Sequence, residues 1–89
     1  MDEFTEIKSL IDTKDVVLGS EQSIKNLKKG NVEKVFITSN CSTRTKQEIE
    51  EYAKIDSVDV SVMDMTNEDL GMLCKKPFSI SVLSVIKGK

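Results

Sequence analysis

The spacing of apolar residues changes repeatedly along this chain, and this alternation constrains the fold more than any other feature. Phe4, Ile7 and Leu10 recur at helical spacing. Val16–Leu18, in contrast, is a short apolar run that ends at Gly19. The first pattern is typical of a helix with one buried face, and the second is typical of a buried strand. The chain is therefore predicted to begin as a helix followed by a strand.

The same alternation continues to the end of the sequence. Gly30 is a predicted helix stop, and Thr45 followed by Glu48 has the pattern of a capping box at a helix start. Thr66 marks another helix start, and Pro77 lies where that helical pattern ends. We therefore expect helices that contain residues 4–11, 20–29, 45–53 and 66–73, and strands at residues 16–18, 35–37, 58–62 and 80–86.

Helices and strands that alternate with short connections indicate an α/β protein, and we predict a three-layer α/β/α sandwich. The last predicted strand is apolar on both faces, as expected for a sheet that is covered on both sides. With 89 residues, the chain is expected to form one domain over residues 1–89. No apolar run is long enough to span a bilayer, and the acidic start is not typical of a secretory signal, so we expect a cytoplasmic protein without membrane contact.

Charge is distributed unevenly, although the net charge is only −2. The segment from Gly71 to Lys89 contains four lysines and no acidic residue, whereas acidic residues gather in the first fifteen positions and from Glu48 to Asp69. This asymmetry is compatible with a basic patch on an otherwise acidic body, which is one mark of a nucleic-acid binder. A mixed, solvated surface is the alternative, and the charge distribution by itself favours it.

The sequence offers little for catalysis or metal binding. Without histidine, zinc sites of the usual Cys/His types, a Cys–His pair and a Ser–His–Asp triad are all excluded. Cys41 and Cys74 form no CxxC pair and are expected to be free thiols in a reducing compartment. Glu50 and Glu51 lie on the polar side of a predicted helix, where solvation is the ordinary outcome. We therefore expect no enzyme, no cofactor and no metal.

The strongest candidate for a binding site is the junction that starts at Gly19. Glycine permits a tight turn after the strand, and the helix that follows presents unpaired N–H groups at its positive dipole end. Lys28 and Lys29 lie on the same helix face as Lys25, and a bound polyanion would offset the cost of these like charges. The alternative is an ordinary lysine-rich solvated helix. The candidate residues are Gly19, Ser20, Glu21, Gln22, Lys25 and Lys28.

Two later loops are further candidates. Asn40 follows the second predicted strand, and its amide can donate and accept hydrogen bonds at once. A plain turn is the alternative there. In the segment Lys75-Lys76-Pro77-Phe78, the phenyl ring could pack against a splayed-out base while the lysines meet phosphate groups. A core phenylalanine that opens the last strand is the alternative for Phe78.

These segments together resemble a known family. The stretch from Gly19 to Gly30 resembles the first RNA-contacting segment of the L-seven-Ae / L-thirty-e superfamily of kink-turn RNA binders. Val35–Ile37 followed by Asn40 is similar to the second strand and loop of that family. The resemblance extends over residues 4–86 and includes the following further segments: Glu48–Lys54, Leu70-Gly71, Pro77-Phe78 and the strand with Ser81, Leu83 and Val85.

The resemblance implies a mixed four-stranded sheet and binding of RNA where a stem bends sharply beside tandem sheared G·A pairs. By position, Gly19, Ser20, Glu21, Gln22 and Lys25 would meet the sheared pairs and the adjoining backbone. Asn40 would contact the same region, and the loop 75–79, including Lys76, Pro77 and Phe78, would cover an extruded base.

The function that the resemblance implies is a non-catalytic structural protein of the large ribosomal subunit. Such a protein would bind rRNA beside ribosomal proteins and be a monomer outside its particle. One alternative is an L-seven-Ae-like kink-turn binder of guide-RNA or RNase P particles. Another is a protein-interaction domain of the same fold that has lost RNA binding, which Glu21 and the acidic charge balance favour.

Overall fold

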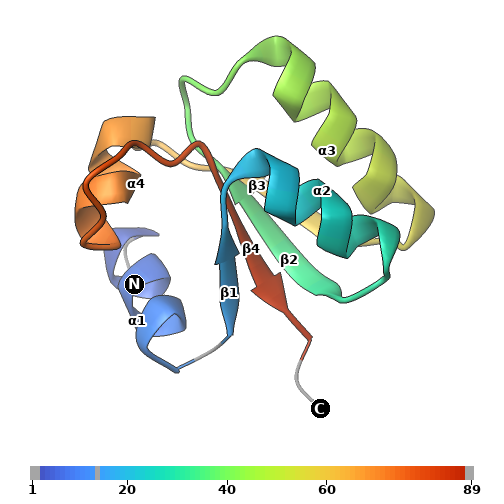
Figure 1. The fold of residues 1–89 in the computed structure, drawn as a ribbon, viewed down its shortest axis with the longest axis horizontal. Coiled ribbons are helices and arrows are strands. Elements are labelled where there is room, and N and C mark those ends of the chain that lie inside the picture. The colour runs from blue at the N-terminus through green and yellow to red at the C-terminus, as the bar shows by residue number, and fades with distance from the viewer. Residues whose placement is uncertain (1–2, 14, 88–89) are drawn as a thin grey trace.

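Helices and strands alternate along the described chain, as the spacing of apolar residues predicts (Figure 1). The computed structural model describes residues 3–13 and 15–87; the side chains of Glu3, Phe4 and Thr13 lie outside this description. The elements are α1 (Glu3–Thr13), β1 (Val16–Leu18), α2 (Ser20–Lys28), β2 (Val32–Ile37), α3 (Thr43–Ile55), β3 (Asp59–Val62), α4 (Asn67–Leu73) and β4 (Val82–Ile86).

The strands form one mixed sheet in the order β1-β4-β2-β3. β4 is antiparallel to both of its neighbours, and β2 is parallel to β3. As a result, β1, β2 and β3 all end at the edge of the sheet where β4 begins. Every connection that leaves β1, β2 or β3, and the loop that enters β4, therefore meets at this one end.

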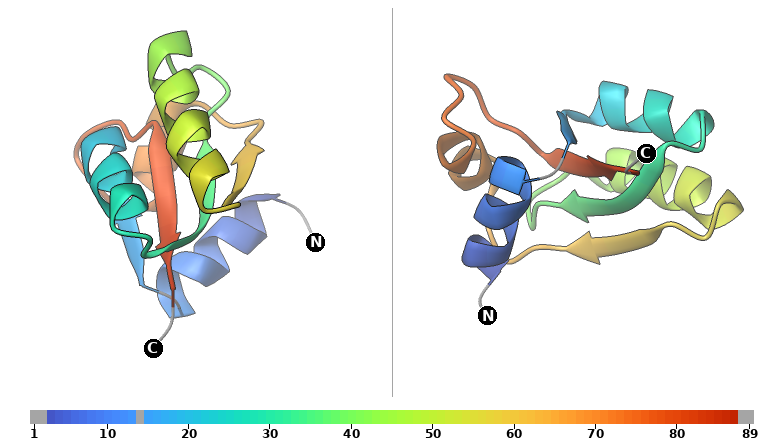
Figure 2. Two further views of the ribbon diagram at one scale, coloured as in Figure 1. Left: turned by 90° about the vertical axis from the view of Figure 1, so that its right-hand side faces the viewer. Right: turned by 90° about the horizontal axis from the view of Figure 1, so that it is seen from below.

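Each face of the sheet is covered by two helices, which confirms the three-layer arrangement (Figure 2). Ile7 of α1 and Leu70 of α4 pack with Phe36 and Leu83 in one apolar cluster. On the other face, α2 and α3 pack over a second cluster. That cluster contains Leu27, Val32, Val35, Ile37, Ile49, Ala53 and Val82. All residues from Val82 to Val85 are buried, as predicted for a strand covered on both sides.

Several boundaries differ from the sequence-based prediction, including the start of β2, which is Val32 rather than residue 35. The cap of α3 is Ser42, whose hydroxyl accepts from the Thr45 N–H at 3.3 Å, so the predicted capping box at Thr45 and Glu48 is wrong. Thr45 is instead the third helical residue, and Glu48 pairs with Arg44 at 3.5 Å. The last strand begins later than residue 80, because the Ile80 N–H donates to the Asn67 carbonyl at 3.0 Å rather than to a neighbouring strand.

Candidate nucleic-acid interface

The three segments singled out in the sequence lie at the same end of the sheet (Figure 1). The Gly19 N–H donates to the Val82 carbonyl at 2.8 Å, and the Thr38 N–H donates to the Ser81 carbonyl at 3.0 Å. The start of β4 is therefore held between the junction before α2 and the loop after β2. The loop 74–81 enters β4 at this point, which places all three candidate segments together.

The start of α2 is shaped by a glycine and closed by no side chain. Gly19 has φ 101° and ψ 152°, a backbone conformation that essentially only glycine adopts. No side-chain hydrogen bond caps the helix, and its first internal bond is donated by the Ser23 N–H to the Gly19 carbonyl at 3.1 Å. The N–H groups of the first helical turn consequently face outward at the positive end of the helix dipole.

The polar side chains of this turn are suited to a ligand that forms hydrogen bonds. Glu21 and Gln22 are exposed, and Ser20 is half-buried. Ser23, in the same turn, is fully buried, so the turn has one face on the sheet and one face in solvent. A ligand at this turn would meet main-chain donors first and the side chains of Ser20, Glu21 and Gln22 around them.

The two α2 lysines are not equally close to the helix start. Lys25 and Lys28 are exposed, and both line a shallow groove between α2 and α3 that also contains Glu21 and Glu48. Lys28 is the last residue of α2, about 12 Å along the axis from Ser20, and its Nζ lies 5.1 Å from the centre of the Tyr52 ring. Lys25 is thus the lysine placed to assist the helix start, whereas Lys28 lies at the margin.

Asn40 connects the loop after β2 to the start of α4. Its amide nitrogen donates to the Asn67 side-chain oxygen at 2.9 Å, and its own oxygen accepts from the Asn67 N–H at 2.9 Å. Because an amide group carries two N–H donors and two lone pairs, Asn40 keeps capacity for a ligand. Asn67 was not singled out from the sequence; its place directly after the Thr66 cap is the signal that could have revealed it.

The loop 74–81 presents an aromatic ring to solvent. Phe78 is 58% exposed, so the alternative of a core phenylalanine is wrong. Gly71 of α4 allows this loop to lie against the helix, since a Cβ at that position would meet the Phe78 carbonyl oxygen. Lys76, Pro77 and Phe78 line one shallow pocket with Met72, which is itself 75% exposed. An exposed ring beside lysines is suited to stacking on a base.

The two cysteines are free thiols, as predicted. Burial raises the pKa of the Cys41 thiol, and Lys46 and a hydrogen bond from the Ser42 backbone lower it by less. Burial likewise raises the pKa of the Cys74 thiol against a smaller opposite effect of Lys76. Neither thiol is activated as a nucleophile, because activation requires a lowered pKa.

No helix within residues 3–13 and 15–87 is long and apolar enough to cross a bilayer.

The fold is an α/β/α sandwich, and one end of its sheet combines an uncapped helix start, an asparagine loop and an exposed aromatic loop. Sequence comparison identifies the class of protein that has this fold. Residues 4–89 match the Ribosomal protein L7Ae/L30e/S12e/Gadd45 family. The chain belongs to this family, and the resemblance drawn from its motifs is confirmed.

Its relatives include proteins named large ribosomal subunit protein eL30. The one from Methanococcus vannielii is 40% identical over 81 residues, which cover 91% of this chain and 77% of that protein. The one from Sulfurisphaera tokodaii is 42% identical over 82 residues, which cover 92% of this chain and 77% of that protein. A protein of unknown function from Bacillus halodurans has a solved structure with a TM-score of 0.82 and 20% identity, covering 99% and 88% of the two chains; it supports the fold alone.

Proposed function

We propose that this chain is a non-catalytic structural protein of the large ribosomal subunit that binds kink-turn RNA. The observation that carries the proposal is the convergence of the α2 start, Asn40 and the Phe78 loop at one end of the sheet. Membership of the family and the name shared by its archaeal relatives support it.

In the proposed complex, the N–H groups of the first turn of α2 and the Lys25 ammonium hold the RNA backbone. Ser20 and Gln22 read the edges of guanine bases in the sheared pairs, and the Glu21 carboxylate lies beside them. The absence of a side chain at Gly19 leaves open space in front of the backbone, because no heavy atom beyond Gly19 and its two chain neighbours lies within 4 Å of the point where a Cβ would stand. The RNA can therefore approach the main chain closely.

The loop 75–79 has a different role from that of α2. Phe78 stacks on the base that the kink extrudes, Pro77 stiffens the loop, and Lys76 meets the neighbouring phosphate. Asn40, in the loop after β2, can donate its remaining amide N–H to the RNA. The whole chain, residues 1–89, acts as one domain, located in the ribosome of the cytoplasm beside other ribosomal proteins and monomeric when outside it.

One observation favours a second candidate. Glu21 is exposed in the first turn of α2, where a carboxylate faces the proposed RNA. Repulsion between this group and phosphate would suit a protein-interaction domain that has lost RNA binding.

A titration distinguishes the two candidates, using a short RNA duplex with a three-nucleotide bulge and tandem G·A pairs, and a fully paired duplex as the control.

The proposal expects tight binding that requires the bulge. Equal and salt-sensitive binding to both duplexes, or no binding, would contradict it. RNA that co-purifies with the protein then separates the ribosomal assignment from the alternative of guide-RNA or RNase P particles, because the former would yield rRNA.

Replacing Lys25 by alanine tests the electrostatic part of the site. Because a lysine that contacts phosphate releases about one counterion, we expect the slope of log affinity against log salt to fall by about 0.7 to 0.9. Lys87 is an exposed lysine beyond the other end of β4, and Lys87→Ala is the matched control. An equal change of slope in both variants would mean that only overall charge attracts the RNA.

A further inference from the structure

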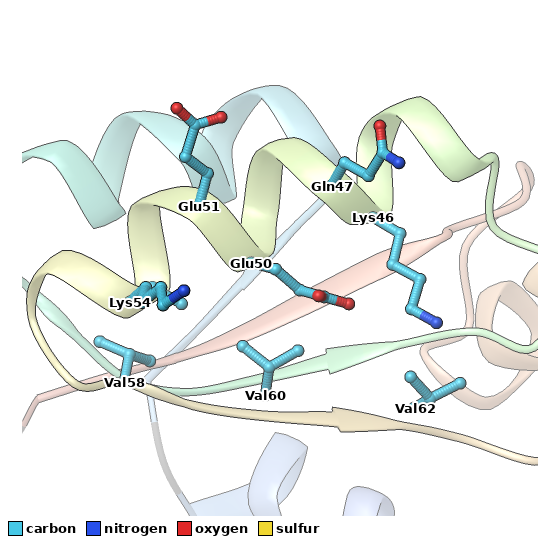
Figure 3. Close-up of a pocket in the computed structure, with 9 residues that line it drawn as sticks. Lys46, Gln47, Glu50, Glu51, Lys54, Val58, Val60 and Val62 are labelled. Atoms are coloured by element: carbon cyan, nitrogen blue, oxygen red, sulfur yellow. The ribbon is translucent and has the colours of Figure 1, made fainter.

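A groove runs along the free edge of the sheet, away from the end where the RNA is proposed to bind. β3 is the outermost strand on this side, and α3 passes over it without covering it (Figure 3). The residues that line the groove include Lys46, Glu50, Glu51 and Lys54 of α3, together with Val60 and Val62 of β3 and Val58 just before that strand. Nothing in the proposed RNA contact uses these residues.

The backbone of β3 has hydrogen-bonding groups directed away from the sheet. The Met63 N–H donates to the Ile37 carbonyl at 2.6 Å, so the backbone of Met63 faces β2. Alternate residues of a parallel strand face the same neighbour, so Ser61 also faces β2, and Val60 and Val62 turn their N–H and C=O groups outward. These two residues can pair with one further strand.

The same two valines form part of the floor of the groove. Val62 is 49% exposed, and Ile55 at the end of α3 is 76% exposed. Sheet edges are usually protected by charged residues, proline or a covering segment, whereas the sequence of β3 has only Asp59 at its first position. An edge with open main-chain groups and partly exposed valines is suited to the addition of a strand from another protein.

The spacing of the charged residues above the groove is close to the spacing of alternate residues in a strand. Lys46, Glu50 and Lys54 are spaced by four residues, about 6 Å of helix, which is close to the roughly 6.7 Å between alternate residues of a strand. Figure 3 shows Lys46, Glu50 and Lys54 placed above Val62, Val60 and Val58 respectively. None of the three forms an ion pair within the part of the chain that the structure describes.

The order of these charges indicates whether the groove binds a second copy of this chain or a different protein. Read along the strand they are positive, negative and positive, which is the same in either direction. Pairing of β3 with β3 of a second copy, about a twofold axis normal to the sheet, would place Lys46 near Lys54 and Glu50 near Glu50. Like charges would then face each other along the seam, which disfavours self-pairing.

We propose that β3 and its groove bind an extended segment of another protein in which alternate residues are acidic, basic and acidic. The methylene stems of these side chains would cover the valines while their charged ends pair with Lys46, Glu50 and Lys54. The intervening residues would be polar, because they lie beside Asp59 and Ser61, whose side chains project from the opposite face of β3. The carboxylate of Glu50 in the middle of the row disfavours RNA as the occupant.

The test is a titration of isotope-labelled protein, followed by amide NMR signals, with the peptide Thr-Glu-Thr-Arg-Thr-Glu-Thr. The control peptide Thr-Arg-Thr-Glu-Thr-Arg-Thr carries the inverted charges. We expect the signals of Val60 and Val62 to shift, and the control to bind about tenfold more weakly, because three exposed ion pairs become three repulsions.

Two charge reversals on α3 give a matched pair of variants. Figure 3 shows Glu50 directed toward the strand, whereas Glu51, which also lines the groove, is directed away from the strand. In Glu50→Lys the first peptide exchanges one of its three attractions for a repulsion, and the control peptide exchanges one of its three repulsions for an attraction. The tenfold preference for the first peptide should therefore fall to about twofold. Glu51→Lys makes the same change of net charge and should keep the preference close to tenfold.

Four outcomes would overturn the proposal. They are equal affinity for both peptides, no shift in β3 at millimolar peptide, self-association of the free protein that shifts the β3 signals, and a shift of those signals by the bulged RNA duplex. The last outcome would assign the groove to RNA. Failure of RNA binding at the α2 start would leave this result unaffected, because the two sites use different residues.

Discussion

Three helices begin at the same end of the sheet, and two of them are capped by their own side chains. The Ser42 hydroxyl caps α3, and Thr66 and Asp69 cap α4 with a reciprocal capping box. α2 begins at Gly19 and has no side-chain cap. Replacing a polar cap by alanine typically costs about 1 kcal/mol of stability, but replacing it by glycine costs only about a few tenths, so Gly19 leaves α2 without a side-chain cap at little cost in stability.

The contrast shows how this fold can make a binding site without dedicated catalytic or charged pockets. Where a side-chain cap is present, it accepts a hydrogen bond from one N–H group of the first helical turn. Where it is absent, the same groups remain available to an anionic or carbonyl acceptor from a ligand. The proposed RNA contact thus depends on the missing side-chain cap of α2 as much as on Lys25.

The largest effect is expected for Gly19→Ala. A backbone at φ 101° and ψ 152° costs an alanine about 1 to 3 kcal/mol, and relaxation of that strain would move the start of α2. We expect lower stability in urea unfolding and at least about tenfold weaker binding of bulged RNA.

Gly30→Ala is the control at the other end of α2. Gly30 also has a positive φ, 72°, and a Cβ there would lie 3.3 Å from an Asp56 carboxylate oxygen. The expected loss of stability is about 1 to 2 kcal/mol, with RNA affinity unchanged in the folded protein. Equal losses of affinity in the two variants would remove the special role of the α2 start.

Removing the α4 cap should affect stability but not RNA binding. Thr66→Ala abolishes the bond from the Asp69 N–H, at 3.2 Å in the structure, and should lower the free energy of unfolding by about 0.5 to 2 kcal/mol. RNA affinity measured well below the melting temperature should stay within about twofold. A much larger loss would show that the start of α4 also contacts RNA, and the contrast between the helices would have to be abandoned.

Glu21→Gln is expected to have a smaller effect, of opposite sign in stability and binding. The carboxylate interacts favourably with the N-terminal end of α2, so its removal should cost about 0.3 to 1 kcal/mol of stability. If RNA lies at this turn, affinity should rise by about two- to fivefold, because a repulsion disappears. The same substitution at exposed Glu33, near the start of β2 and so toward the opposite end of the sheet, should leave affinity unchanged.

The smallest effect concerns the thiols beside the capped helices. Cys41 directly precedes the Ser42 cap, and burial raises its pKa. A raised pKa in the folded state keeps the thiol protonated, so its contribution to stability is present below the unfolded pKa and is lost as pH rises above it. At about pH 8, alkylation by iodoacetamide should be slower in the folded protein than in urea, since the thiolate is the reactive form. Equal rates would indicate a solvent-exposed thiol.

Much of the candidate site could be predicted from short stretches of the sequence. Gly19, followed by polar residues and Lys25, indicates a helix start that can bind an anion, and Thr66 with Asp69 identifies the capping box of α4. The start of α3 was predicted wrongly because Ser42 and Thr45 are both good caps, and the choice between them depends on where the loop from β2 can turn. Similarly, the sequence around Phe78 is compatible with a core residue or a surface ring.

The order of helices and strands follows from the sequence without help from the fold, because apolar spacing and turn residues act over a few neighbouring positions. The exclusion of histidine chemistry follows in the same way. The meeting of Gly19, Asn40 and Phe78, in contrast, depends on the insertion of β4 between β1 and β2, which no local pattern specifies. The position of β3 at an edge with its valines open is likewise a result of tertiary structure, because strand order is set by long-range packing on both faces of the sheet.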